Sequence, residues 1–252
     1  MAEGSFRSED YLPKAKIGVL LPLPVVDVSP YEFYSIVRDR VMLCMVPGQV
    51  YEFTREDMER VLRTVDADID RLVQRDVDII AQYGVPLPVL IGVEAHDRLL
   101  KHIAERSGRP STSNITGIVA GARHVGIKKI VTCNKWSAAM NNSLAEFFAR
   151  GGITLAGVVS DVQPVAEFQN TRSRDAMELA YALGSRALKE YPEADGLYLG
   201  GGTWLSEPVS VALEAEFGKP VLTNNQAAVW DMLHLAGCWT PIEGHGALLA
   251  SK

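Results

Sequence analysis

The sequence predicts an α/β fold with two pseudo-symmetric lobes, each a parallel sheet flanked by helices, and a ligand cleft between the lobes. Three observations support this fold class. Short apolar runs alternate with amphipathic stretches along the chain, and part of one half repeats weakly in the other half. In addition, 47% of the 252 residues are hydrophobic, which is enough to build a sizeable buried core.

Seven short runs rich in apolar and β-branched residues predict buried strands. They cover residues 17–21, 41–46, 77–81, 127–133, 153–159, 196–200 and 219–223. Helix-start signals lie between several of them, such as Thr54 with Asp57 three residues later and the Ser-Glu-Pro sequence at 206–208. This alternation predicts parallel sheets, whose ligands bind beyond the carboxyl ends of the strands.

The internal repeat pairs GRPSTSN at 108–114 with GKPVLTN at 218–224. In each half, a charged helix leads to a strand, a glycine-bearing turn, a second helix and then this Gly-basic-Pro strand. The two turns lie at 83–84 and 200–203. Lobes related in this way would place two glycine turns and two helix N-termini on opposite sides of one small ligand, which favours an anion.

The same pattern predicts the domain boundaries. We expect residues 1–125, completed by the C-terminal segment 225–252, to form the first α/β lobe, and residues 126–224 to form the second. The sequence sets no subunit number, so a homo-oligomer is compatible with it.

Charge and composition exclude several classes of protein. The chain has 25 Lys and Arg against 31 Asp and Glu, so it lacks the basic surface that neutralises phosphates, and we expect no nucleic-acid partner. The longest apolar stretches, 17–21 and 41–46, are far shorter than a bilayer requires, and we expect no membrane partner. Residues 1–16 lack the pattern of a secretory signal, which predicts a cytoplasmic protein.

Three cysteines, Cys44, Cys133 and Cys238, show neither CxxC nor Cys/His ligand spacing. We therefore predict no disulfide framework and no metal site. Cys133 ends the strand at 127–133 near the expected cleft, where a reactive thiol is one interpretation and a buried core residue is the other. We favour the core interpretation for all three.

The most specific motif in the second half is DGLYLGGG at 195–202, followed by the segments 217–227 and 230–237. Its first-half counterpart is VDIIAQYG at 77–84, followed by residues 108–110 and 125–130. Over nearly its whole length, the chain resembles the aspartate/glutamate racemase superfamily. Within that superfamily, it is most similar to the branch of maleate cis-trans isomerase and arylmalonate decarboxylase.

The resemblance implies cofactor-independent chemistry, in which one or two cysteines, one per lobe, act on a substrate whose carboxylate is held by amides. Both cysteine positions carry glycine here, Gly84 in the first lobe and Gly201 in the second. The Thr-Ser pair of the decarboxylases corresponds to Val85 and Pro86, and their Tyr to Trp136. The resemblance therefore implies a rebuilt pocket and a mechanism without thiols, and we expect the two glycines to enlarge the cleft and expose amides.

Four residues are candidates for catalysis. Tyr83 and Thr203 place hydroxyl groups on the two opposed turns, with a core aromatic and a helix N-cap as the respective alternatives. His96 lies near the start of the helix after the first turn, where it could act as a general acid or base or could have no catalytic role. Lys135 could hold a carboxylate or lie on the surface.

The candidates for substrate binding are the turn residues, their neighbours and the residue at the family's tyrosine position, whose indole could cover a planar substrate. They are Gly84, Val85, Trp136, Gly201, Gly202, Asn224 and Asn225.

These observations predict a cofactor-independent, decarboxylase-like lyase or isomerase that acts on a small organic acid, with a role in the catabolism of an aromatic or heteroaromatic compound. One alternative is a hydrolase or hydratase that uses the emptied thiol space for water. A second is a non-catalytic carboxylate-binding protein. Binding without turnover would favour the second alternative, and incorporation of oxygen from water would favour the first.

Overall fold

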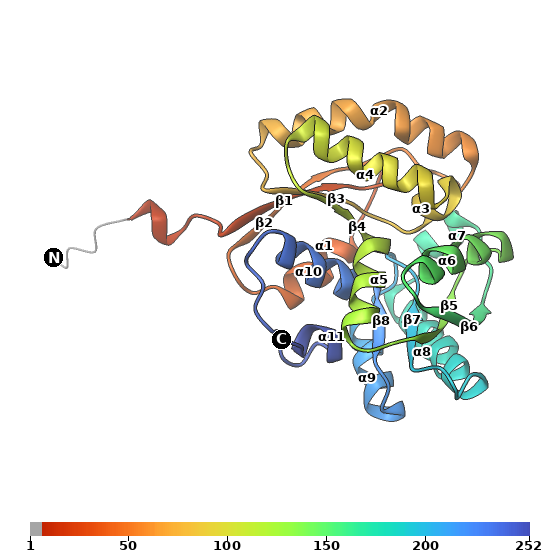
Figure 1. Ribbon diagram of the computed structural model, residues 1–252. Coiled ribbons are helices and arrows are strands. Elements are labelled where there is room, and N and C mark those ends of the chain that lie inside the picture. The colour runs from red at the N-terminus through yellow and green to blue at the C-terminus, as the bar shows by residue number, and fades with distance from the viewer. Residues whose placement is uncertain (1–6) are drawn as a thin grey trace.

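The computed structural model describes residues 7–252, except for the side chains at positions 10, 55, 168 and 169. It contains two four-stranded sheets in which every strand pair is parallel (Figure 1). The first sheet has the order β2-β1-β3-β4 and the second the order β6-β5-β7-β8. The strands of the first sheet are β1 (Ala15–Leu20), β2 (Val41–Val46), β3 (Ile79–Gln82) and β4 (Ser111–Ser113). Those of the second are β5 (Lys129–Asn134), β6 (Thr154–Ser160), β7 (Gly196–Leu199) and β8 (Val221–Thr223).

Helices connect and cover both sheets. In the first half these are the short 3-10 helix η1 (Ser8–Asp10) and α1 (Val28–Ile36), α2 (Arg55–Gln74), α3 (Pro86–Ile91), α4 (Val93–Ser107) and α5 (Asn114–His124). In the second half they are α6 (Ala138–Arg150), α7 (Val165–Asn170), α8 (Ser173–Glu190), α9 (Glu207–Phe217), α10 (Asn224–Leu235) and α11 (Ala247–Ala250). Helices α2 and α4 cover one side of the first sheet, whereas α5 and α10 pack against each other in the middle of the molecule (Figure 1).

The two halves are built alike, as the repeat predicts, and the predicted fold class is confirmed. Helices α5 and α10 begin at Asn114 and Asn224, directly after the short strands β4 and β8. Their N-caps are also equivalent, because the hydroxyl groups of Ser113 and Thr223 accept from backbone amides three residues further on. Thr54 caps α2 in the same way, with Asp57 N donating to its Oγ1 at 3.2 Å.

A shared apolar core joins the two sheets. Its largest cluster of buried side chains includes residues from β1 and β3, from β5 and β7, and from α5 and α10. Phe33 and Ile36 of α1 belong to this cluster and are almost fully buried. Complete burial of such a side chain contributes about 1.5–3 kcal/mol, so these two residues fix α1 firmly at the junction of the two halves.

The C-terminal segment returns to the first half of the chain, because α10 packs on α5 and α1 after β8 has completed the second sheet. For this reason we propose that residues 1–125 together with 225–252 form one lobe and residues 126–224 the other. Among residues 7–252, no helix has both the length and the apolar character that a membrane crossing requires.

Candidate active site

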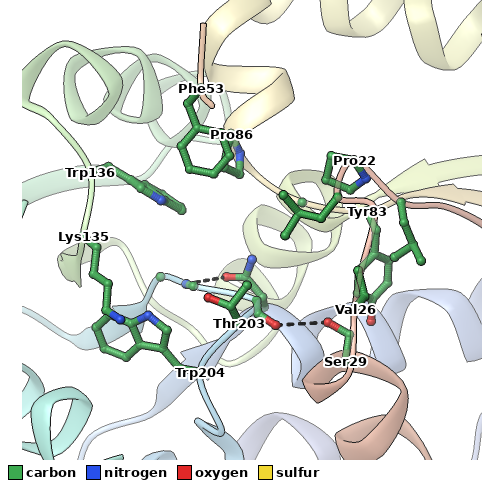
Figure 2. Close-up of a pocket in the computed structure, with 17 residues that line it drawn as sticks. Pro22, Val26, Ser29, Phe53, Tyr83, Pro86, Lys135, Trp136, Thr203 and Trp204 are labelled. Carbon is green, nitrogen blue, oxygen red and sulfur yellow. Dashed lines mark hydrogen bonds between the residues drawn. The ribbon is translucent and has the colours of Figure 1, made fainter. Parts of the chain in front are cut away.

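A cavity lies where the carboxyl ends of the two sheets meet, and it contains about 630 Å³ of empty space, including the part that is open to solvent. Its lining comes mainly from the loops that follow β1, β3, β5 and β7 (Figure 2). The lining residues are Leu21, Pro22, Leu23, Val26, Ser29, Phe53, Tyr83, Gly84, Pro86, Lys135, Trp136, Gly200, Gly201, Gly202, Thr203, Trp204 and Asn224. Aromatic and apolar groups dominate this lining, and few polar groups reach it.

The cavity brings together most of the candidate residues from the sequence. Eight of them contribute to the lining: Tyr83, Gly84, Lys135, Trp136, Gly201, Gly202, Thr203 and Asn224. The remaining three, His96, Val85 and Asn225, are not among its lining residues.

His96 is buried away from the cavity. Its Nε2 lies 2.8 Å from Ser113 Oγ, and its ring packs edge-on against Phe147. Burial lowers the pKa of His96 to about 4, so the imidazole is neutral at pH 7. The structure thus places this side chain in the packing between α4, α5 and α6, whereas the sequence predicted a position at the cleft.

Val85 and Asn225 are also fully buried. Val85 belongs to the shared apolar core, where it precedes the first residue of α3. The Asn225 side chain donates from Nδ2 to the carboxylate of Glu32. Both residues therefore support the walls of the site from behind.

The two glycine turns face the same cavity and are held in equivalent ways. The Gly84 amide donates to Asn114 Oδ1 at 2.6 Å, and the Gly201 amide donates to Asn224 Oδ1 at 3.2 Å. The two asparagines are linked in turn, because Asn114 Nδ2 donates to the backbone oxygen of Asn224 at 3.0 Å. The internal repeat thus produces a pseudo-symmetric pair of turns that are locked by the first residues of α5 and α10.

The expectation that the glycines enlarge the cleft and expose their amides is wrong. A Cβ atom on Gly84 would lie 2.8 Å from Pro22 Cγ, and one on Gly201 would lie 2.9 Å from Trp204 Nε1. Both glycine amides already donate to asparagine side chains. Since glycine lets a neighbour approach the backbone closely, Pro22 and Trp204 lie where they would crowd the Cβ atom of any other residue at these positions.

Lys135 brings a cationic group to the cavity. The residue is 2% exposed, and its Nζ lies 4.6 Å from the ring centroid of Trp204, within range of a cation–π interaction. Burial lowers the pKa of Lys135 to about 8, while the negative charge of Asp161 raises it. Most Lys135 side chains therefore carry a proton at pH 7, and loss of that proton costs less than it would in water.

Hydroxyl groups from both lobes also reach the cavity (Figure 2). Burial raises the pKa of Tyr83 well above its usual value, so its phenol stays protonated. Ser29 Oγ donates to the backbone oxygen of Gly202 at 3.1 Å. Thr203 follows the second glycine turn, where Figure 2 shows its side chain among those that line the cavity.

No cysteine is among the lining residues of the cavity in the described part of the chain. Cys133 is fully buried in the apolar core of the second lobe, where burial raises the pKa of its thiol to about 12. Cys44 and Cys238 are partly buried and pack against other clusters. Within residues 7–252, no three His, Cys, Asp or Glu side chains gather closely enough to hold a metal ion.

The paired parallel sheets, with a cavity at their carboxyl ends, have the fold of arylmalonate decarboxylase and maleate isomerase. A family model described as arylmalonate decarboxylase matches residues 24–249, and the chain belongs to that family. The proteins that the chain resembles are decarboxylases and isomerases.

Known proteins resemble the chain over almost its whole length. An arylmalonate decarboxylase from Bordetella bronchiseptica is 24% identical over 225 residues, which is 88% of this chain and 90% of that protein. A crystal structure of arylmalonate decarboxylase has a TM-score of 0.78 at 22% identity, covering 93% of this chain and 98% of the other. A maleate cis-trans isomerase from Nocardia farcinica, in a mutant form with a covalently bound succinylcysteine intermediate, has a TM-score of 0.82 at 17% identity, covering 94% and 98%.

Proposed function

We propose that this protein is a decarboxylase-like lyase or isomerase whose substrate is a small organic acid with an aromatic or other planar group, and that it works without a thiol. The observation that carries the proposal is the position of Lys135, a buried cation in a mostly apolar cavity with several aromatic side chains, where the two sheets meet. The ammonium group suits a carboxylate, and the indoles of Trp136 and Trp204 suit a planar ring.

For a malonate that bears an aryl group, the reaction would begin with breakage of a carbon–carbon bond. Carbon dioxide leaves, and the bonding electron pair stays on the α-carbon, where the remaining carboxylate and the ring delocalise it. Lys135 then donates a proton from Nζ to that carbon and regains one from water. A pKa near 8 suits this role, because the group is protonated at pH 7 and yet gives up its proton readily.

The surroundings of the ammonium group would assist this reaction. Trp204 lies beside Nζ and excludes water from one side of it, and Phe53 and Pro86 lie across the cavity from Thr203 (Figure 2). In a site with little water, the attraction between an ammonium group and a developing negative charge is stronger than in bulk solvent.

Of the two alternative functions, the hydrolase or hydratase used the emptied thiol space for water. Pro22 and Trp204 lie so close to the two glycines that they would crowd a Cβ atom there, which narrows this space. The non-catalytic alternative is distinguished from the proposal by whether turnover accompanies binding.

The test uses phenylmalonate, the simplest arylmalonate, in deuterated buffer followed by NMR. We expect the wild-type protein to release phenylacetate with one deuterium on the α-carbon. Lys135→Met should lower the rate at least about 100-fold, since a general acid typically contributes about 10²–10⁴-fold. Lys129 begins the strand β5 that Lys135 follows, and it pairs with Glu193 away from the cavity, so Lys129→Met should leave the rate unchanged. A wild-type protein that neither converts phenylmalonate nor gains thermal stability from it would contradict the proposal.

A further inference from the structure

Glu32 of α1 is a buried carboxylate that makes its hydrogen bonds to the second half of the chain. The residue is 1% exposed. Its Oε1 accepts from the backbone amides of Ser206 at 2.6 Å and Glu207 at 2.8 Å. Its Oε2 accepts from Asn225 Nδ2. One side chain therefore ties α1 to the starts of both α9 and α10.

These bonds supply what the N-terminus of α9 lacks. The Ser206 side chain at the N-cap accepts no capping hydrogen bond, and Pro208 in the first turn has no amide hydrogen. The first amides of a helix need acceptors from outside the helix, and the partial positive charge at this end favours an anion. Glu32 provides that acceptor from a position 174 residues away in the sequence.

The segment that these contacts hold is the loop between β7 and α9. Its residues 200–204 all line the cavity, and Ser206 and Glu207 end the loop and begin the helix. On α1, one turn before Glu32, Ser29 donates to the oxygen of Gly202. On the opposite side, Asn224 accepts from the Gly201 amide. Helix α1 thus makes hydrogen bonds to the loop on both sides of Thr203 and Trp204, at Gly202 and at Ser206.

The charged and titratable groups around Glu32 come from several elements. Glu207 at the start of α9 repels it, and His245 of the C-terminal segment pairs with Glu207 at 2.9 Å. The negative charge of Glu32 contributes to the raised pKa of Tyr83, which follows β3. Asn225 on α10 donates a hydrogen bond to Glu32. Burial raises the pKa of Glu32 to about 7. Burial of the Glu32 carboxylate costs free energy, which its hydrogen bonds to the cavity loop offset only in part.

We propose that Glu32 is a positioning residue, which fixes the loop 200–206 and through it places Thr203 and Trp204, and the Lys135 ammonium beside Trp204, for binding of the carboxylate substrate. The inference deepens the proposed function and rests on it. Its structural half, the hold on the loop, is measurable without any substrate.

The experiment compares amide hydrogen exchange of the peptide that covers residues 200–207 in the wild type and three variants. Glu32→Leu removes all acceptors, whereas Glu32→Gln keeps Oε1 for the two amides. The new amide can donate to Asn225 Oδ1 after that side chain turns over, because this oxygen is buried and accepts no hydrogen bond from any residue between 7 and 252. Asp231→Leu is the matched control, since Asp231 is another largely buried carboxylate, which accepts from Thr112 away from this loop.

We expect Glu32→Leu to speed exchange at residues 200–207 at least tenfold and to weaken phenylmalonate binding at least tenfold. Measured at pH 5, where Glu32 of the folded protein is itself protonated, Glu32→Gln should stay within about threefold of the wild type in both measurements. Asp231→Leu should leave exchange at 200–207 unchanged. A folded Glu32→Leu protein with wild-type exchange, or with a loosened loop and wild-type binding, would overturn the inference. An equal effect of Asp231→Leu would overturn it too, because the loop would then respond to general instability.

If Glu32→Leu does not fold, two further measurements still test the inference. Glu32→Asp shortens the side chain by one methylene group and should speed exchange at Ser206 and Glu207, and wild-type exchange in this variant would refute the role. In the wild type itself, the same two amides should exchange at least 100-fold more slowly than in an unstructured chain. Unprotected amides would refute the hold on the loop, whereas protected amides without phenylmalonate binding would refute only the proposed function.

Discussion

Lys135 is the residue on which the proposed chemistry depends, and its environment predicts a pH profile. Burial lowers its pKa from 10.5 to about 8, so the ammonium form present at pH 7 is lost as the pH rises through 8. We expect kcat/KM for phenylmalonate to fall above pH 8 with a midpoint near that value. Steady-state rates from pH 6 to 9.5 measure this directly.

The control for the pH profile is Lys135→Arg, because the guanidinium stays charged over the whole range. This variant should show a lower rate, since the planar group fits the lysine site poorly, and no alkaline decline. A wild-type profile that remains flat to pH 9.5 would show that the Lys135 proton takes no part in the reaction.

Gly201 predicts the cost of restoring a thiol at the second cysteine position. Its φ of +154° disfavours a side chain, and a new Cβ would lie 2.9 Å from Trp204 Nε1. Gly201→Cys should lower the free energy of unfolding by roughly 1–3 kcal/mol, as overpacking usually does. Gly202→Cys is the matched control, because the nearest atoms to its Cβ would be 3.7 and 3.8 Å away.

Urea denaturation gives the free energies of unfolding of the two variants, which are then compared. Equal stability of Gly201→Cys and Gly202→Cys would mean that Trp204 moves aside without cost, and the thiol space would then be available after all.

The sequence could predict which loops line the site, because they follow apolar runs, but not which neighbouring side chains pack against the glycine turns. Gly84, Trp136 and Thr203 follow apolar runs, so the α/β pattern alone places them near one edge of a sheet. Pro22 and Trp204 were missed, because their approach to the glycines depends on the paths of two irregular loops. His96 had a suitable place in the sequence, but its ring turns into the packing between helices.

At the scale of elements, α1 shows why some functional contacts escape sequence reasoning. Nothing in the sequence around Glu32 points to α9. Its carboxylate nevertheless accepts hydrogen bonds from the backbone amides at the N-terminus of that helix. A single clue was available, because the helix start at 206–208 has a serine and a proline but no glutamate at the position that completes a capping box. Seven of the strands, in contrast, were predicted to within about two residues, because each is a short apolar run. Strand β4, with the polar sequence Ser-Thr-Ser, was expected only from the internal repeat.

Glu32 also predicts a stability difference that depends on pH. Its pKa is raised from 4.5 in the unfolded chain to about 7 in the folded protein, so between these values the folded state binds the extra proton. The stability that this group contributes is present below pH 4.5 and is lost as the pH rises through 7. Relative to the wild type, Glu32→Gln should therefore gain stability between pH 4.5 and 8, by up to roughly 3 kcal/mol.

Urea unfolding of the wild type and Glu32→Gln at pH 5 and pH 8 measures this gain, and subtraction removes the contributions of all other carboxyl groups. A stability difference that is the same at both pH values would show that Glu32 titrates normally and stays charged in the folded protein.

At the level of the whole molecule, two similar halves meet at one cavity, and no cysteine is among its lining residues in the described part of the chain. In the maleate isomerase of Nocardia farcinica, a succinylcysteine intermediate shows a thiol joined to the substrate. Here glycines stand at the positions that resemble the family's cysteines, and neighbouring side chains would crowd a Cβ atom there. We therefore predict that the protein forms no fumarate from maleate at an enzymic rate, which NMR of a maleate solution would show. Steady production of fumarate would mean that a thiol reaches the cavity.

A cysteine-free protein tests whether the family's fold here acts on an organic acid without any thiol. The variant carries Cys44→Ser, Cys133→Ala and Cys238→Ser. The change at Cys133 leaves a small void in the second-lobe core, so the melting temperature is measured alongside and assays are run well below it. We expect this variant to decarboxylate phenylmalonate within about fivefold of the wild-type rate, a change of about 1 kcal/mol in the barrier. A folded cysteine-free protein that has lost essentially all of the wild-type turnover would contradict this expectation.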